Sequence, residues 1–326
     1  MKGDMMKDGK MKVLVTGGAG FIGSHIVDLL IENGYEVIIV DNLSTGKEEF
    51  INKKAIFYKK DITDDDLCKI FEKEKPDYVI HQAAQIDVQK SINDPVFDAK
   101  VNVLGTVNLL ECCRKSGIKK IIYASSAAVY GNLEYLPIDE VHKVNPISYY
   151  GISKHTPEHY FEVYSQLYGL KYTILRYANV YGIRQDPKGE GGVISIFVDK
   201  MLKGERPIIF GDGNQTRDFV YVKDVAKANL LALEKGDNEV VNISTGKPTS
   251  INALVEIMNK IMGTSLKPIY AEPRKGDIVY SYLDNKKAKD VLGWKPEYSL
   301  EEGLRETIEY YRVRYVEYEV AVGKEK

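Results

Sequence analysis

Short apolar runs alternate with helix-period patterns along the first half of the chain. An apolar run over 12–16 leads into a glycine cluster, after which apolar residues recur at helical spacing from 21 to 31. Continuous runs of this length suit parallel strands buried on both faces. The alternation continues and predicts strands at 36–40, 55–58, 78–81, 121–124 and 172–176, with helices at 64–73, 96–116 and 150–168. Strands that alternate with helices predict an α/β fold, a Rossmann-type doubly wound parallel sheet.

The pattern changes after residue 177. Loops rich in Gly, Asp and Asn follow, interrupted by a helix predicted over 193–203. A helical pattern over 222–233 and a strand pattern over 240–244 could rejoin the sheet, so we expect no single clean boundary. The predicted division is a sheet domain at 11–177 with about 222–250 returning to it, a smaller discontinuous C-terminal domain at 178–221 and 251–315, and flexible tails at 1–10 and 319–326. A charged amphipathic helix over 300–318 should cover the surface.

Composition narrows the class of protein. The 326 residues are 44% hydrophobic and 28% charged with a net charge of −2, as expected of a soluble globule without a global field for nucleic acid or anionic lipid. The longest aliphatic run, Val37 to Val40, is far shorter than the ~20 residues that span a membrane. We therefore expect neither a nucleic-acid nor a membrane partner.

The cysteines and histidines indicate no metal site. The three cysteines lack metal-ligand spacing, and adjacent cysteines rarely bridge each other, so we predict buried thiols in a reducing cytoplasm for Cys68, Cys112 and Cys113. No recognisable ligand set accompanies the histidines, so we expect packing or surface roles for His81, His155 and His159.

A glycine cluster between the first predicted strand and helix indicates a dinucleotide site. Gly17, Gly20 and Gly23 stand at three-residue spacing, where glycine permits a positive φ and a close approach of the backbone to a pyrophosphate. Asp41 ends the second strand 18 residues beyond Gly23, near the spacing of an acid that binds the adenosine ribose. A carboxylate there repels a 2′-phosphate and favours NAD over NADP. Alternatively, Asp41 only caps the turn that follows it.

A second acid stands just after the third strand. Asp61 and Ile62 could contact adenine, but an acid at such a position is equally often a helix N-cap. The sequence leaves both interpretations open.

A tyrosine, a lysine and a serine form the candidate catalytic group. Tyr150 and Lys154 are one helical turn apart, so one helix face presents both side chains. Ser126 follows the strand at 121–124, at the sheet edge where ligands of parallel sheets bind. A tyrosine is a poor base at neutral pH, but a nearby ammonium and a nicotinamide ring favour its phenolate. Such a group can remove an alcohol proton while hydride leaves for the cofactor.

These motifs resemble the extended short-chain dehydrogenase/reductase superfamily, with the UDP-glucose 4-epimerases as the nearest group. The likeness rests on the glycine cluster, on Ser126 to Gly131 and on Tyr150 to Lys154, and continues through Arg176 to Gly182 and Thr216 to Phe219. It covers about residues 11 to 315. The resemblance implies that the sheet domain binds NAD and that the smaller domain holds a UDP-sugar.

The resemblance also assigns further residues. The catalytic residues would be Ser126, Tyr150 and Lys154. The cofactor contacts would be Gly17, Gly20, Phe21, Ile22, Gly23, Asp41, Asn42, Asp61, Ile62, Ala83, Asn102, Ser125, Tyr150 and Lys154. The substrate contacts would be Ser126, Tyr150, Asn179, Val193, Phe210, Arg217, Arg274, Asp277 and Ser281. Guanidinium groups suit a diphosphate by bidentate geometry, which supports the two arginines.

The implied reaction is epimerisation at C4 through a transient 4-keto sugar, without net redox change. Related 4,6-dehydratases generally carry an acidic pair after the serine, where this chain has Ala127 and Ala128. We therefore favour epimerisation over dehydration. A decarboxylase, a uronate epimerase and a non-catalytic NAD-binding sensor remain alternatives.

Two further expectations follow from the resemblance. Ser281 matches a position where a bulky residue narrows the sugar pocket, so this small side chain should leave room for a 2-acetamido group. The superfamily usually forms homodimers through a four-helix bundle. The apolar positions that fit a dimer seam fit ordinary packing on the sheet equally well, and these are Val101, Leu104, Val107 and Leu110.

Overall fold

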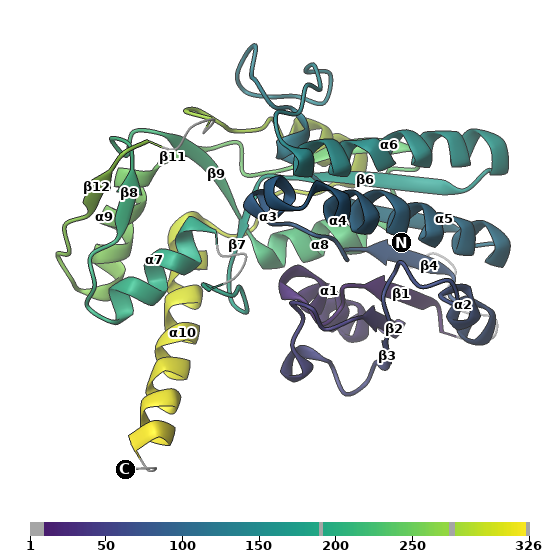
Figure 1. Ribbon diagram of the computed structural model, residues 1–326, viewed down its shortest axis with the longest axis horizontal. Coiled ribbons are helices and arrows are strands. Elements are labelled where there is room, and N and C mark those ends of the chain that lie inside the picture. Colours follow the sequence, from purple (N-terminus) through teal and green to yellow (C-terminus); the bar gives the residue numbers. More distant parts are fainter. Residues whose placement is uncertain (1–9, 189–191, 274–277, 324–326) are drawn as a thin grey trace.

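The computed structural model describes residues 10–188, 192–273 and 278–323. A seven-stranded sheet forms its larger part, and all of its strands are parallel, in the order β10-β6-β5-β4-β1-β2-β3 (Figure 1). The strands are β1 (Lys12–Thr16), β2 (Glu36–Asp41), β3 (Ile56–Lys59), β4 (Tyr78–His81), β5 (Lys120–Ser126), β6 (Lys171–Tyr177) and β10 (Glu239–Ile243). The predicted doubly wound parallel sheet is confirmed.

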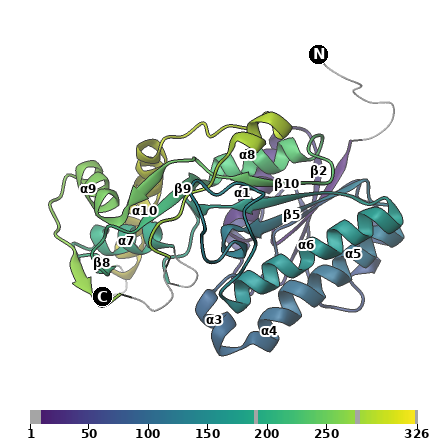
Figure 2. The same cartoon turned by 90° about the horizontal axis from the view of Figure 1, so that it is seen from above.

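Helices cover both faces of this sheet. On one face α1 packs beside α8 (Figure 2), and on the other α5 lies between α2 and α6 (Figure 1). The helices of this part are α1 (Phe21–Glu32), α2 (Cys68–Glu74), α3 (Val88–Asn93), α4 (Pro95–Ala99), α5 (Gly105–Ser116), α6 (Tyr149–Tyr168) and α8 (Val222–Ala232). Two apolar clusters fill the spaces between helices and sheet, and fully buried β-strand residues such as Val15 and Ile121 belong to them. The alternating pattern of the sequence thus reflects burial on both faces.

A π-helical segment interrupts the helix predicted over 96–116. The segment, Lys100–Leu104, joins α4 to α5 and carries Asn102, which is 2% exposed. Single π turns are common at functional sites because they shift the direction of one side chain. The sequence pattern does not reveal this insertion.

The smaller part of the molecule contains more regular structure than the loops predicted from the sequence. It holds a three-stranded sheet and a two-stranded sheet, with helices around them (Figure 1). Its elements are β7 (Asn179–Tyr181), α7 (Val193–Leu202), β8 (Ile208–Phe210), β9 (Thr216–Tyr221), β11 (Pro248–Ser250), α9 (Ile251–Met262), β12 (Ile269–Ala271) and α10 (Leu300–Gly323). Short 3-10 or π turns at Glu48–Phe50, Ala127–Val129 and Ala288–Leu292 complete the secondary structure.

The chain returns to the large sheet after this excursion. β10 pairs in parallel with β6, with Val241 opposite Leu175. α8 precedes β10 and packs on α1, so residues from 222 onward contribute to the core of the sheet. The domain division itself stays a prediction.

Two sequence-based expectations are wrong. Cys68 and Cys112 form a disulfide between α2 and α5, and Cys113 is the buried free thiol. They are brought together by helix packing, which sequence spacing cannot show. α10 extends five residues past its predicted end at 318, so 319–323 is helical. Leu304 and Ile308 anchor this helix in a third apolar cluster. Among the described residues, every helix is too short or too polar to span a bilayer.

Candidate active site

The sheet order places a crevice beside the carboxyl end of β1. From β1 the chain continues to β2 and β3 on one side, whereas β4, β5 and β6 lie on the other. Ligands of open parallel sheets bind at such a reversal of strand order, outside the carboxyl ends of the strands. The glycine loop, which joins β1 to α1, and Ser126, at the end of β5, both stand at this edge.

The conformation of the glycine loop explains its residue types. Gly17 has a φ of 70°, and an added Cβ would lie 2.7 Å from the backbone nitrogen of Ala83. A Cβ on Gly23 would lie 2.1 Å from the Gly17 carbonyl oxygen. Gly20 is the N-cap residue of α1, so no side chain caps the start of this helix. Its first turn therefore presents backbone N–H groups and the positive end of the helix dipole to the crevice, as a pyrophosphate requires.

Asp41 has two roles at this end of the crevice. Its carboxylate accepts hydrogen bonds from the backbone N–H groups of Ala19, at 3.0 Å, and Leu43, at 2.8 Å. Burial raises the pKa of Asp41, and these two hydrogen bonds oppose the rise. Asp41 therefore caps the turn that follows it, which is one of the two interpretations that the sequence left open. Asp41 also lines the glycine-loop cavity, so both interpretations are compatible.

Asp61 is held in a similar way. It accepts hydrogen bonds from the backbone and hydroxyl of Thr63 and from the amide of Asn42, the last at 2.6 Å. Burial acts to raise the pKa of Asp61, but these hydrogen bonds outweigh burial and lower it. The carboxylate stays ionised beside Ile62 in the cavity wall.

The glycine-loop cavity continues into a second cavity that contains the candidate catalytic group. The second cavity has a volume of about 230 Å³ and is lined by Ser125, Ser126, Tyr150 and Lys154. Both cavities share five lining residues, which are Phe21, Ile22, Gln82, Ala84 and Ile86. Together they form one groove, which we call the cofactor groove. It runs from the two acids at one end to Tyr150 at the other, the shape that an extended dinucleotide needs.

Lys154 is enclosed in the protein interior. It is 4% exposed, and its ammonium lies 4.6 Å from the centre of the Tyr123 ring. Burial lowers the pKa of Lys154 to about 7, although the negative charges of Glu158 and Asp98 act in the opposite direction. A lysine with a pKa near neutrality can both stabilise a neighbouring phenolate and exchange a proton.

A buried ion pair lies one helical turn below Lys154. Glu158 accepts two hydrogen bonds from Arg176, at 3.1 and 2.6 Å, and one from the Ser125 hydroxyl at 2.6 Å. Burial acts to raise the pKa of Glu158, but hydrogen bonds from His155, Arg176 and Ser125 lower it to about 2. The sequence analysis did not single out Glu158. Its spacing of four residues from Lys154 was the available signal.

Ser126 ends β5, and Tyr150 lies in the first turn of α6. The Ser126 hydroxyl oxygen accepts a hydrogen bond from the backbone of Ala128 at 3.1 Å, which leaves its O–H able to donate. Ser148 caps α6 by accepting from Gly151, and the Tyr150 backbone donates to Ser91 of α3. Capping fixes the first turn of α6, so the position of Tyr150 in the cavity wall is determined by local structure.

Most of the predicted site residues line the cofactor groove. The predicted cofactor contacts other than Asn102 line one or both cavities, as do four predicted substrate contacts, Ser126, Tyr150, Asn179 and Val193. Asn102 lies behind the wall, where its amide bonds to Gln85, Asp98 and Ser153. The structure also adds a cation that sequence reasoning missed, Lys90 of α3, which lines the glycine-loop cavity.

The other predicted substrate contacts lie apart from this groove. Among the described residues, Phe210, Arg217 and Ser281 are absent from the lining of its two cavities. Arg217 donates to the carbonyl of Ile278 at 2.7 Å. Arg274 and Asp277 lie outside the described residues.

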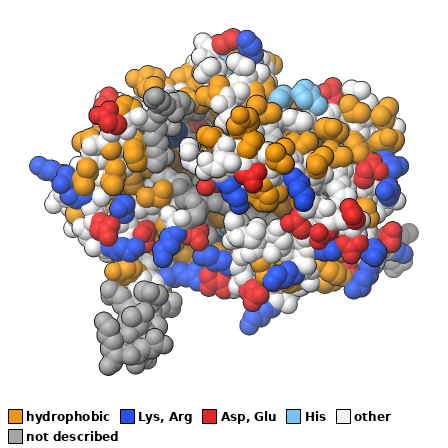
Figure 3. Space-filling model, in the orientation of Figure 1, with side chains coloured by type: hydrophobic (Ala, Val, Ile, Leu, Met, Phe, Trp, Pro, Cys, Tyr) orange, Lys and Arg blue, Asp and Glu red, His pale blue; other side chains and the backbone are white. Residues whose placement is uncertain are grey.

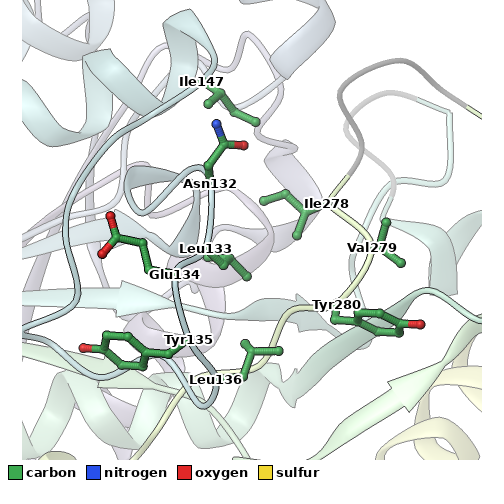
Figure 4. A pocket seen from close by; sticks show the side chains of 9 residues that line it. All are labelled: Asn132, Leu133, Glu134, Tyr135, Leu136, Ile147, Ile278, Val279 and Tyr280. Atoms are coloured by element: carbon green, nitrogen blue, oxygen red, sulfur yellow. The ribbon is translucent and has the colours of Figure 1, made fainter.

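A third cavity of about 500 Å³ lies between two segments, 132–136 with Ile147 on one side and 278–280 on the other (Figure 4). The backbone of Thr216 on β9 donates to Val279, which ties the second segment to the smaller part of the molecule. Tyr280 lines the cavity and directly precedes Ser281.

Comparison with known proteins gives consistent matches. A model of the NAD dependent epimerase/dehydratase family matches residues 13–244. A UDP-glucose 4-epimerase from Thermotoga maritima, solved with UDP-glucose, is 54% identical with a TM-score of 0.92, covering 94% of this chain and 100% of that one. A UDP-glucose 4-epimerase from Thermus thermophilus, solved with NAD, is 43% identical with a TM-score of 0.87, covering 93% and 99%.

A third structure has a different sugar in its name. A UDP-N-acetylglucosamine 4-epimerase from Methanobrevibacter ruminantium, solved with UDP-N-acetylmuramic acid, is 41% identical with a TM-score of 0.90. The match covers 94% of this chain and 99% of that one.

Proposed function

Because the chain belongs to the NAD-dependent epimerase/dehydratase family, we propose that it is an NAD-dependent sugar-nucleotide epimerase that interconverts UDP-glucose and UDP-galactose at C4. The observation that carries this proposal is the cofactor groove, which joins a glycine loop to a cavity with Ser126, Tyr150 and Lys154. The relative from Thermotoga maritima, which is 54% identical, is named a UDP-glucose 4-epimerase, and this supports the choice of sugar.

The chain's own residues suit NAD. The glycine loop and the first turn of α1 would hold the pyrophosphate, and Asp41 would accept hydrogen bonds from the adenosine ribose. The same carboxylate would repel the 2′-phosphate of NADP. Bound NAD supplies reversible acceptance of a hydride from the sugar carbon.

The catalytic side chains would handle the proton. Tyr150 as phenolate would take the proton of the sugar 4-hydroxyl, with Lys154 stabilising the phenolate charge and Ser126 donating a hydrogen bond to the sugar oxygen. The sugar would turn over in the cavity as a 4-keto compound. Tyr150 would then return the proton, so no acid or base is consumed. Ala127 and Ala128 supply no group that could eliminate water, which favours epimerisation over dehydration.

The experiment uses purified protein and four sugar nucleotides. We expect NMR to show conversion of UDP-glucose to UDP-galactose without added cofactor, because no net redox change occurs. Parallel incubations contain UDP-N-acetylglucosamine, UDP-glucuronate and dTDP-glucose. A 4-keto-6-deoxy product would indicate a dehydratase, and loss of carbon dioxide from the glucuronate would indicate a decarboxylase. Either result would replace the proposal.

We also propose that N-acetylhexosamine forms are substrates. Ser281 is a small side chain next to Tyr280, which lines the 500 Å³ cavity, and a relative named for UDP-N-acetylglucosamine is 41% identical. We propose diphosphate binding by Arg217 and Arg274, and sugar contacts by Asp277 and Phe210, on the resemblance alone. Ser281→Tyr should abolish turnover of the acetamido sugar and retain that of UDP-glucose. Equal loss of both activities would contradict this role.

The proposed quaternary structure is a homodimer in the cytoplasm. Exposed apolar side chains gather over α3, α4, the π-helical segment and α6 (Figure 3), and the most exposed of them are Val96, Leu104 and Leu167 at 77%, 64% and 66%. A contiguous apolar surface of this kind is typical of an interface. Val101 and Leu110 do not belong to it: Val101 lines the glycine-loop cavity, and Leu110 is buried. Leu167→Lys should convert a dimer to a monomer in light scattering.

A further inference from the structure

Two histidines on the outer side of α6 point their ring nitrogens at each other. His155 and His159 are four residues apart, and their Nε2 atoms are separated by 3.1 Å. Their ring planes are inclined at 71°. Histidines at this helical spacing are the arrangement by which helices bind zinc, with both imidazoles on one face.

The separation of the nitrogens matches a chelate. Zinc binds imidazole nitrogen at about 2.0–2.1 Å in tetrahedral geometry, which places two such nitrogens a little over about 3 Å apart. A cation between the two Nε2 atoms therefore needs only a small outward movement of the rings. Without a cation, one Nε2 must donate its hydrogen to the other.

A buried carboxylate orients the first imidazole. His155 Nδ1 lies 3.2 Å from the Glu158 carboxylate, which also accepts two hydrogen bonds from the Arg176 guanidinium, so Nδ1 carries the hydrogen. The lone pair of His155 is therefore on Nε2 and faces His159. A carboxylate that accepts from the distal nitrogen is the usual support of a metal-bound histidine, since it fixes the tautomer and raises the basicity of the ligand.

The other histidines have different surroundings. His81 is buried between the hydroxyls of Thr16 and Thr106. His25 is buried against the carbonyl of Ile183, and His142 is buried in the loop before α6. All five histidines of the chain lie within the described residues, so the pair on α6 is the one exposed imidazole cluster in the protein. Figure 3 shows histidine side chains at the surface above α6.

We propose that His155 and His159 form a binding site for a divalent transition-metal cation of the zinc class. Among the described residues no third His, Cys, Asp or Glu completes the set, so water molecules take the remaining positions. On binding, the hydrogen of His159 moves from Nε2 to Nδ1, and each Nε2 lone pair forms a bond to the metal. Glu158 retains its hydrogen bond from His155. The inference does not depend on the proposed function, although Glu158 links the pair to the wall of the catalytic cavity.

The test measures zinc binding to the untagged full chain after removal of metals. Titration calorimetry of the wild type should show one Zn²⁺ per chain, with binding that weakens as pH falls because protonated imidazoles cannot ligate. His159→Ala removes one ligand from an exposed position, and His155→Asn removes the other while retaining a donor for Glu158. Each should weaken zinc binding at least tenfold. Thr156→Ala, on the same turn of α6, should bind zinc as the wild type does.

Two control measurements complete the test. Mg²⁺, which prefers oxygen ligands, should give no binding heat under the same conditions. Circular dichroism of each variant shows whether the fold is retained. The proposal is overturned if the wild type binds no zinc, or if folded His159→Ala and His155→Asn bind it as tightly as the wild type.

Discussion

The two ends of the cofactor groove differ in the groups that form them: backbone at one end and polar side chains at the other. At the glycine-loop end, Gly17, Gly20 and Gly23 form part of the wall, and their lack of a side chain is the essential property. At the catalytic end, Ser126, Tyr150 and Asn179 come from separate elements, and a buried charge network supports them. The first end should therefore be sensitive to added volume. The second should be sensitive to the loss of a single polar group.

The largest effect is expected at the catalytic end. Tyr150→Phe removes the proposed proton acceptor. Because general acid–base catalysis contributes about 10²–10⁴-fold, kcat should fall by a factor in that range. NAD binding should persist, because the glycine loop is unchanged. The neighbouring Tyr149 is 51% exposed, and Tyr149→Phe is the matched control with expected wild-type activity. Turnover by Tyr150→Phe within about tenfold of wild type, which is ~1.4 kcal/mol, would refute the role.

The second largest effect is expected from the buried ion pair of Glu158 and Arg176. Glu158→Gln leaves Arg176 buried without its ionic partner, which costs about 3–5 kcal/mol of unfolding free energy. Replacing both, as Glu158→Gln with Arg176→Met, should recover much of this loss in denaturant unfolding. If the single variant is as stable as the wild type, the network does not stabilise this end of the groove.

The same carboxylate should set the pH dependence of catalysis. The negative charge of Glu158 raises the pKa of Lys154, so its removal lowers that pKa further. The ammonium is then lost at lower pH, and the alkaline limb of kcat/KM should shift to lower pH in Glu158→Gln. A merely structural role would lower activity at all pH values without moving this limb.

Added volume separates two functions of the glycine loop. Gly23→Ala places a Cβ against the Gly17 carbonyl and should reduce both NAD affinity and the melting temperature. Gly20→Ala meets only that carbonyl at 3.2 Å, so the fold should tolerate it while NAD affinity falls about tenfold, or ~1.4 kcal/mol. Calorimetry of NAD binding and thermal unfolding measure both effects. Equal losses of stability in the two variants would contradict this separation.

The smallest effect on activity is expected from the disulfide, because neither of its cysteines lines the cofactor groove. Cys68→Ser opens a link between α2 and α5 across 44 residues and should lower the unfolding free energy by about 2–4 kcal/mol. NAD affinity and kcat should remain unchanged. Reduction of the wild type should reproduce the loss, and no difference between reduced and oxidised protein would show that the link is not formed in solution.

The fold class and the cavity-lining residues were accessible from sequence for one reason. Buried parallel strands need continuous apolar runs, and the glycine loop needs specific residue types within a short segment, so both leave local patterns. Tyr150 and Lys154 also share one helix and appear as a spacing. Lys90 and Glu158 have no such local signature, because their importance depends on neighbours from other elements.

Sequence alone determined the α/β class and the glycine loop, and it proposed the candidate catalytic side chains, since each follows from periodicity or from chemistry within a few residues. The tertiary structure decided the rest. It joined Cys68 to Cys112, inserted the π turn at Asn102, placed Glu158 beneath Lys154 and brought the Nε2 atoms of His155 and His159 to 3.1 Å. These features depend on how whole helices pack and on which rotamers that packing permits, and distances of this kind are not encoded by any single segment.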